Sequence, residues 1–226
     1  MLYLVGLGLD LKDISLKALE VIKECDEVFL ENYTITFPYT VEELEKVINK
    51  KIALADRKFV ESNFFVEESK NKNVVILVYG DPLAATTHIN FVRETKAKVI
   101  HAPSILTAIS ETGLQLYKFG KTASIPKWQD SFKPTSFFQV VKDNLSIKAH
   151  TLLLVDIGMP LKEALLELDL ASGKELGNKE IIICSKLGTE DGKIISGKLS
   201  KLKSKKVKEP FSIIIPAELS FGEEIL

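Results

Sequence analysis

The sequence predicts an α/β protein in which short buried strands alternate with amphipathic helices. Short, continuous apolar runs end in glycine, proline or polar residues, as buried strands do. Between these runs lie stretches whose apolar residues recur with helical periodicity and whose opposite faces are charged. Such alternation is typical of α/β layers. A length of 226 residues suits one large domain or two small ones.

The first half of the chain opens with a buried strand at Leu2 to Leu7, and a helix is expected from Asp13. Thr40 and Glu43 predict a capping box at the start of a later helix. Further strands are expected at 27–30, 51–55, 73–79 and 98–101. Further helices are expected at 59–70, between the strands 73–79 and 98–101, and at 103–112, where Gly113 closes the helix.

The composition of the sequence changes after Gly113. Residues 114–135 hold Gly120, Pro126, Pro134 and the only tryptophan, so we interpret them as a connection that carries one strand. We place the domain boundary at its start, which gives an N-terminal α/β domain at 1–113 and a C-terminal α/β domain at 114–226. The second domain is expected to contain helices at 136–145 and 160–168 and strands at 151–157, 180–185 and 211–215.

Composition narrows the classes of function. A net charge of −1 creates no overall field that selects nucleic acid or a membrane, and no apolar run reaches the ~18 residues of a membrane span. Cys25 and Cys184 lie outside any CxxC pattern, which favours buried, reduced thiols in a cytoplasmic protein. One cluster of lysines stands out. We interpret it as a solvated edge of the protein in preference to a docking patch for an acidic or RNA-bearing partner. It comprises Lys198, Lys201, Lys203, Lys205, Lys206 and Lys208.

Three predicted strand ends carry glycine or small polar residues, and ligands of open α/β sheets bind outside such ends. Gly6 and Gly8 follow the first strand and allow close approach of a ligand. They do not form the dinucleotide fingerprint GxGxxG, which fails at Leu11. A nucleotide-binding dehydrogenase is therefore a distant alternative.

The second strand end is the turn Gly80-Asp81-Pro82, which leaves a carboxylate at the edge of the sheet. Asp81 either caps its own turn or contacts a ligand. The small residues, threonines and histidine that follow it in the sequence support contact with a ligand. The third is His101 to Ile105, where Pro103 suits the first turn of a helix and Ser104 offers a hydroxyl.

The sequence contains none of the common metal-binding or catalytic motifs that we considered. The three histidines do not have metal-ligand spacing, and neither GxSxG nor GxxxxGK[ST] occurs. We therefore predict no metal site, and no residue stands out as a general base, so the catalytic residues stay unassigned. Backbone, small residues and a carboxylate suffice for methyl transfer from a sulfonium. The donor is already activated, and the protein mainly aligns the reacting atoms.

Taken together, these segments resemble the diphthine synthase family of the tetrapyrrole-methylase superfamily. The matching segments occur in the family's order and cover most of the chain, and HAPSI and TGLQLYKFGKTAS are specific to it. They are LYLVGLGL at 2–9 with Asp13-Ile14-Ser15 following, GDPLAATTH at 80–88, HAPSI at 101–105, TGLQLYKFGKTAS at 112–124, PTSFFQVVKDN at 134–144 and HTLLLVDI at 150–157.

The resemblance implies a tetrapyrrole-methylase fold of two α/β domains, with S-adenosylmethionine bound in the cleft between them. It implies a cytoplasmic homodimer. It also implies methylation of the amino group of a modified (aminocarboxypropyl) histidine on translation elongation factor 2, in diphthamide biosynthesis, with S-adenosylhomocysteine as product. No membrane and no direct nucleic-acid partner is expected.

The family's cofactor contacts carry over to eight positions. This chain differs from the family at two of these positions. It has Ala84 where the family usually has a valine and Phe211 where the family usually has a histidine. The chain is also shorter than typical members. The eight positions to which the family's cofactor contacts carry over are Leu9, Asp81, Ala84, Ser104, Ile105, Val155, Leu187 and Phe211.

Two alternatives stay open beside this interpretation. One is another methyltransferase of the same fold that acts on a corrin precursor or on ribosomal RNA, and the YKFGK and PTSFF segments argue against it. The other is a non-catalytic relative that binds the cofactor and has lost activity.

Overall fold

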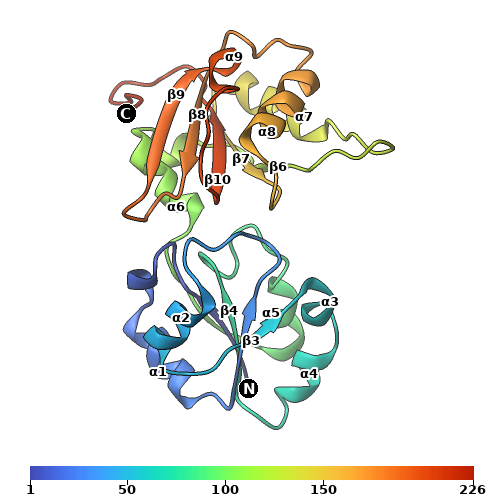
Figure 1. Cartoon of the computed structure of the whole chain (residues 1–226), viewed down its shortest axis with the longest axis vertical. Coiled ribbons are helices and arrows are strands. Elements are labelled where there is room, and N and C mark those ends of the chain that lie inside the picture. The colour runs from blue at the N-terminus through green and yellow to red at the C-terminus, as the bar shows by residue number, and fades with distance from the viewer. The chain divides into compact units, whose positions relative to one another are not determined.

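The computed structural model describes residues 1–226 and contains two compact units, Met1–Ala108 and Ile109–Leu226. Each unit contains one five-stranded sheet with its own helices (Figure 1). The predicted α/β class is confirmed. The division between the units lies before the 3-10 turn Ile109–Thr112, whereas the sequence analysis placed the boundary after Gly113.

The sheet of unit 1 is entirely parallel. Its strands follow the order β3-β2-β4-β1-β5, and each neighbouring pair runs in the same direction. Parallel strands that are buried on both faces have continuous apolar sequences, which is why they could be predicted. The strands are β1 (Leu2–Gly6), β2 (Glu27–Glu31), β3 (Ala53–Ala55), β4 (Val74–Val78) and β5 (Lys98–Ile100).

Helices cover both faces of this sheet (Figure 1). Leu4 of β1 packs in one apolar cluster with Phe65, whereas the next residue, Val5, packs in the other cluster with Ile22. Successive side chains of a strand point to opposite faces, so one strand supplies both cores. One face carries α1 (Leu16–Glu24) and α2 (Val41–Ile48), and the other carries α3 (Arg57–Val60), α4 (Phe64–Glu68) and α5 (Ile89–Thr95).

One helix start differs from the prediction, and another agrees with it. The helix expected from Asp13 begins at Leu16, because Asp13 ends a 3-10 turn and Ser15 provides the cap, accepting a hydrogen bond from the N–H of Ala18. The capping box of Thr40 and Glu43 at the start of α2 is confirmed.

Two further helices are shorter than predicted. The helix expected at 59–70 is interrupted, because the main chain and the hydroxyl of Ser62 both donate to the carbonyl of Phe59 and end α3 there. The helix expected at 103–112 is α6 (Ile105–Ala108) followed by the 3-10 turn, so Pro103 lies before the helix and not in its first turn.

The sheet of unit 2 is mixed. Its order is β6-β7-β10-β8-β9, with β6 parallel to β7 and the other pairs antiparallel. Its strands are β6 (Ala123–Ile125), β7 (Thr151–Val155), β8 (Glu180–Ser185), β9 (Lys193–Lys198) and β10 (Phe211–Ile215). One apolar cluster joins it to α7 (Ser136–Ser146), α8 (Leu161–Ala171) and α9 (Leu199–Leu202).

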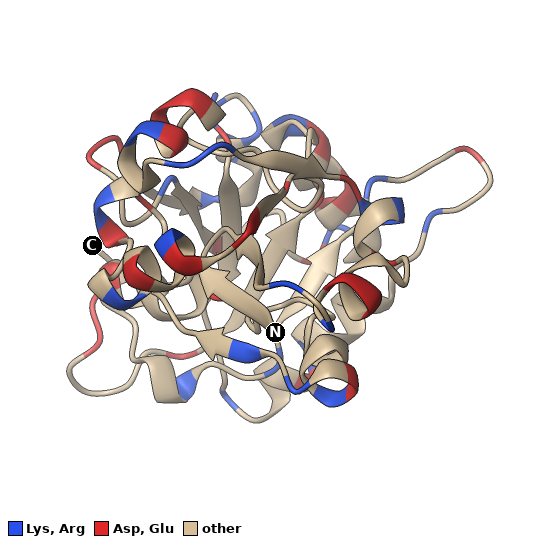
Figure 2. Ribbon diagram, turned by 90° about the horizontal axis from the view of Figure 1, so that it is seen from below, with Lys and Arg blue, Asp and Glu red and all other residues tan.

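The strand β9 and the helix α9 were not predicted. The sequence of β9 contains lysines and a glycine and has few of the apolar residues that indicate a strand. As an edge strand, β9 pairs only with β8, and charged residues are common on such edges. Charged residues of both signs occur throughout the chain (Figure 2).

The C-terminal segment of unit 2 is fixed by the buried carboxylate of Glu223. This carboxylate lies 2.8 Å from Nζ of Lys118 and 2.8 Å from Nε2 of His150. It also accepts from the N–H groups of Gln115 and Ser220. Burial alone raises the pKa of Glu223, but these hydrogen bonds, that of Lys118 foremost, lower it well below its ordinary value.

Both cysteines are free and buried. Burial raises the pKa of Cys25 to about 11 and that of Cys184 to about 12. The chain has no helix long and apolar enough to span a membrane. It also has no group of three or more histidine, cysteine or acidic side chains that could hold a metal ion.

Candidate functional site

Three loops meet at one edge of the unit 1 sheet. Strands β4, β1 and β5 are neighbours and parallel, so their carboxyl ends, at Val78, Gly6 and Ile100, lie side by side. The chain leaves β1 toward the face of α1 and leaves β4 toward the face of α5. Adjacent strands whose connections go to opposite faces form a topological switch point, where open α/β sheets bind ligands.

Glycines hold the first two loops against each other. The N–H of Gly80 donates to the carbonyl of Gly8 at 2.9 Å, and both residues have a positive φ, 70° and 75°. A Cβ on Gly6 would lie 2.6 Å from the carbonyl oxygen of Gly80. Gly6 therefore admits no side chain without a shift of the backbone, and the positive φ of Gly8 and Gly80 favours glycine there.

Asp13 fixes the loop that contains Leu9. Its Oδ2 accepts from the N–H of Leu9 at 2.9 Å and from that of Asp10 at 3.0 Å. The carbonyl of Leu9 accepts from the hydroxyl of Tyr79 at 3.0 Å. Burial, with the charges of Asp13 and Asp10, raises the pKa of Tyr79, so the hydroxyl stays protonated and can donate.

The carboxylate of Asp81 joins the second loop to the third. Its Oδ1 accepts from the N–H of Leu83 at 2.9 Å, within its own turn. Its Oδ2 lies 2.7 Å from Nδ1 of His101 and accepts from the N–H of Ala102 at 3.2 Å. The carbonyl of Asp81 also accepts from the N–H of Ala84 at 3.1 Å. Asp81 therefore caps its turn, as one interpretation of the sequence had it, and also connects two loops.

Ser104 and Ile105 complete the group in unit 1. Ser104 is buried, and its carbonyl accepts from the N–H groups of Thr107 and Ala108 at the start of α6. A Cβ on Gly80 would lie 3.5 Å from the Cβ of Ser104, so the second and third loops are in close contact here. The structure thus gathers at one sheet edge the five predicted contacts of unit 1, Leu9, Asp81, Ala84, Ser104 and Ile105.

The three predicted contacts of unit 2 also share one sheet edge. Val155 ends β7, Leu187 follows β8, and Phe211 begins β10. Phe211 pairs with Ser185 at the end of β8. Leu187 is buried, whereas Val155 and Phe211 are half-buried. Phe211 contacts the apolar core cluster and offers a hydrophobic surface at this edge.

Sequence reasoning missed a buried pair that supports the second loop. Nε2 of His88 lies 2.9 Å from Oε2 of Glu31, at the end of β2, and both side chains are almost fully buried. Nδ1 of His88 lies 3.2 Å from the carbonyl of Pro82, which also accepts from the hydroxyl of Thr86 at 2.6 Å. A glutamate at the end of the apolar strand EVFLE was the only local signal of this pair.

A family model described as Tetrapyrrole (Corrin/Porphyrin) Methylases matches residues 1–203. Diphthine synthase from Methanocaldococcus jannaschii is 38% identical over 247 residues, which cover 99% of this chain and 96% of the relative. Diphthine methyl ester synthase from Homo sapiens is 45% identical over 184 residues, which cover 78% of this chain and 64% of the relative. A crystal structure of diphthine synthase matches with a TM-score of 0.89 and 34% identity, and the match covers 97% of this chain and 91% of that one.

The parallel sheet of unit 1, with its glycine loops at a switch point, and the mixed sheet of unit 2 are those of a methyltransferase fold of the tetrapyrrole-methylase class. The match to full-length relatives narrows this class further. The chain belongs to the tetrapyrrole methylase family and, within it, to the diphthine synthases.

Proposed function

We propose that the chain transfers methyl groups from S-adenosylmethionine to the amino group of the aminocarboxypropyl-modified histidine of translation elongation factor 2, in diphthamide biosynthesis. The observation that carries this proposal is the match to diphthine synthase over 99% of the chain and 96% of the relative. A match of that extent leaves no large part of the relative without a counterpart here. The reaction is assigned to the cytoplasm.

The chemistry of the unit 1 edge suits such a reaction. A sulfonium methyl is already activated, and an amine nucleophile needs only alignment with it at roughly 3–3.5 Å. Loops that are held by glycine contacts, by Asp13 and by Asp81 provide a rigid frame for that alignment. The amine must lose a proton before it attacks, and solvent or a neighbouring carboxylate can accept this proton.

The methyl donor is proposed to contact Leu9, Asp81, Ala84, Ser104 and Ile105 in unit 1 and Val155, Leu187 and Phe211 in unit 2. Each group of residues shares one sheet edge of its unit. The donor presents an adenine ring and a methionyl chain, and the buried or half-buried side chains of Leu9, Val155 and Leu187 provide apolar contacts for them. Calorimetry with S-adenosylhomocysteine should show saturable binding, and NAD should not bind.

The test of the reaction uses labelled S-adenosylmethionine and two forms of elongation factor 2. Label should enter the factor that carries the aminocarboxypropyl histidine, and the unmodified factor should stay unlabelled. Label in a corrin precursor or in ribosomal RNA instead would reject the assignment. Tight donor binding without transfer to any acceptor would favour the alternative that the chain is a non-catalytic relative. Phe211 would then be a candidate cause of the lost activity.

The chain is also proposed to form a homodimer through an apolar surface of unit 2. Large side chains are exposed there, namely Tyr117 at 86%, Ile147 at 72% and Phe221 at 103%. They belong to segments joined by contacts of Lys118 and Lys148 with Glu218. Light scattering should give twice the 25.2 kDa mass of one chain, and Phe221→Ser should shift the mass toward one chain. A wild-type mass of a single chain would contradict the proposal.

A further inference from the structure

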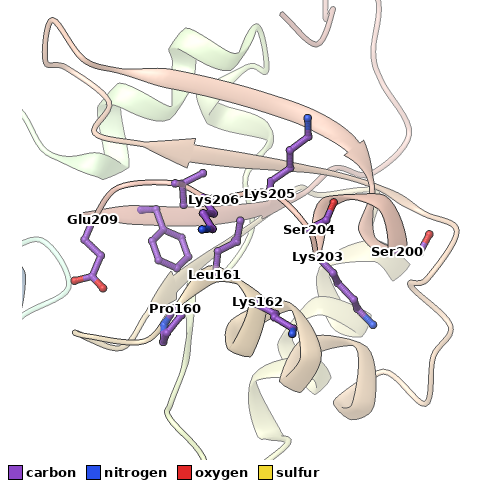
Figure 3. Close-up of a pocket in the computed structure, with 11 residues that line it drawn as sticks. Pro160, Leu161, Lys162, Ser200, Lys203, Ser204, Lys205, Lys206 and Glu209 are labelled. Carbon is purple, nitrogen blue, oxygen red and sulfur yellow. The ribbon is translucent and has the colours of Figure 1, made fainter.

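A hollow of about 790 Å³ lies in unit 2, between the start of α8 and the segment that follows α9 (Figure 3). Leu161, Val207 and Phe211 contribute apolar lining, and lysines line it as well. We call it the basic groove. It is lined by Pro160, Leu161, Lys162, Ser200, Lys203, Ser204, Lys205, Lys206, Val207, Glu209 and Phe211.

The groove carries an excess of positive charge. Four lysines line it against a single acidic residue, Glu209. Lys203 is neutralised by Asp169 at 2.6 Å, but Lys162, Lys205 and Lys206 are exposed and form no ion pair within the chain. Three unpaired ammonium groups around one hollow attract an anionic occupant.

The wall of the groove is held in place. The hydroxyl of Ser185 donates to the carbonyl of Lys208 at 2.7 Å, and the N–H of Lys186 donates to the carbonyl of Pro210 at 2.8 Å. The ion pair of Lys203 with Asp169 fixes the other end of this segment to α8. A preformed groove loses less entropy on binding than a mobile segment would.

The groove is continuous with the proposed donor site of unit 2. Phe211 belongs to both, since it lines the groove and begins β10 at the same sheet edge as Val155 and Leu187. A protein substrate whose side chain reaches the proposed donor site beside Phe211 has the groove next to it, within reach of neighbouring segments.

The lining favours a peptide over RNA. It contains no arginine and only one aromatic side chain, Phe211, whereas single-stranded RNA is bound mainly by aromatic stacking and by arginine. Leucine, valine and proline next to lysines suit a polypeptide segment that has both acidic and apolar side chains.

We infer that the basic groove docks an acidic segment of the protein substrate and holds it while its modified histidine is methylated. The inference rests on the proposed function for the identity of that substrate. Three lysines of the cluster interpreted as a solvated edge, Lys203, Lys205 and Lys206, therefore line a docking groove. Lys198, Lys201 and Lys208 lie outside it.

The test compares two triple variants with equal loss of charge. Lys162→Ala/Lys205→Ala/Lys206→Ala removes the unpaired charges of the groove. Lys17→Ala/Lys23→Ala/Lys58→Ala removes three exposed lysines of unit 1 that form no ion pair within the chain. The probes are a fluorescent hexaglutamate peptide, followed by anisotropy in dilute buffer, and the modified elongation factor in the methyl-transfer assay.

The groove variant should bind the peptide about tenfold more weakly than wild type, because each exposed ion pair contributes modestly and three are lost. Its KM for the factor should rise by a similar ratio with kcat unchanged, and the difference should shrink at high salt. The unit 1 variant should behave as wild type. As a second variant, Lys205→Glu/Lys206→Glu should weaken binding further.

Equal peptide binding by the two triple variants would overturn the inference, as would a single-stranded RNA of equal charge that displaces the peptide at lower concentration. Methyl transfer with an unchanged KM in the groove variant would overturn it while leaving the proposed function intact. Peptide binding that depends on the groove, without transfer by wild type to the factor, would instead reject the proposed function and retain an acidic-peptide site.

Discussion

Nδ1 of His101 lies 2.7 Å from Oδ2 of Asp81, and this contact joins the loop after β5 to the loop after β4. The side chain of His101 is mostly exposed, at 68%, whereas that of Asp81 is 15% exposed. The carboxylate also accepts from two main-chain N–H groups, those of Leu83 and Ala102. Asp81 therefore determines the relative position of two loops of the candidate site.

Replacement of Asp81 should weaken donor binding. Asp81→Ala removes an acceptor of three hydrogen bonds, and a charge-assisted hydrogen bond contributes about 1.5–3 kcal/mol, so the Kd for S-adenosylhomocysteine should rise at least about tenfold. The control is His101→Ala, which keeps both main-chain donors to Asp81 and should have a smaller effect. Calorimetry measures the Kd of both variants. An unchanged Kd for Asp81→Ala would show that Asp81 does not contribute to donor binding.

Gly8 should not tolerate a side chain. It has a φ of 75°, and a Cβ there would lie 2.1 Å from the Cβ of Asp13, the residue that fixes Leu9. Gly8→Ala combines a left-handed backbone cost of about 1–2 kcal/mol with displacement of Asp13. Gly173→Ala is the matched control, because its φ is 60° and nothing lies within 4 Å. Both variants should lower the thermal midpoint, but only Gly8→Ala should lose S-adenosylhomocysteine binding.

The parallel sheet of unit 1 could be predicted from the sequence because each buried strand is an apolar run that ends in glycine or a polar residue. The three loops of the candidate site follow from the same pattern, since their glycines and Asp81 stand directly after those strands. The strand β9 could not be predicted, because an exposed edge strand rich in lysine lacks both signals.

Contacts that are distant in sequence were beyond local patterns. Glu31 and His88 are separated by three helices and two strands, and nothing near either residue specifies the other. The contacts proposed at Val155, Leu187 and Phe211 came from family resemblance alone. Their shared edge depends on the register of β10 against β7 and β8, which the sequence does not reveal.

The pair of Glu31 and His88 should show strong energetic coupling. His88→Ala would remove the imidazole from the buried carboxylate of Glu31 and leave the hydroxyl of Thr34 as its remaining partner. Breaking a buried pair costs about 3–5 kcal/mol. The double variant Glu31→Ala/His88→Ala should be destabilised by less than the sum of the two single variants, because it leaves no unpaired charge. Denaturant titrations of the four proteins give the coupling energy, and additive effects would show that the two side chains act independently.

Glu223 should make the stability of unit 2 depend on pH in the acid range. The hydrogen bonds in the folded chain lower the pKa of Glu223 below its ordinary value of 4.5. A carboxylate with a depressed folded-state pKa stabilises the protein fully above its unfolded pKa, and this contribution decreases as the pH falls from there toward the folded pKa.

Glu223→Gln should therefore lower the thermal midpoint clearly at pH 7, where removing one partner of a buried network costs about 3 kcal/mol. The difference from wild type should narrow below about pH 4, as the wild-type carboxylate begins to lose its advantage. The matched control is Glu218→Gln, whose side chain pairs with Lys148 at 2.8 Å but is 72% exposed, so its effect should be small at every pH. Thermal melts of the three proteins between pH 3 and pH 8 measure this. A difference between wild type and Glu223→Gln that stays constant with pH would show that the charge of Glu223 does not stabilise the C-terminal segment.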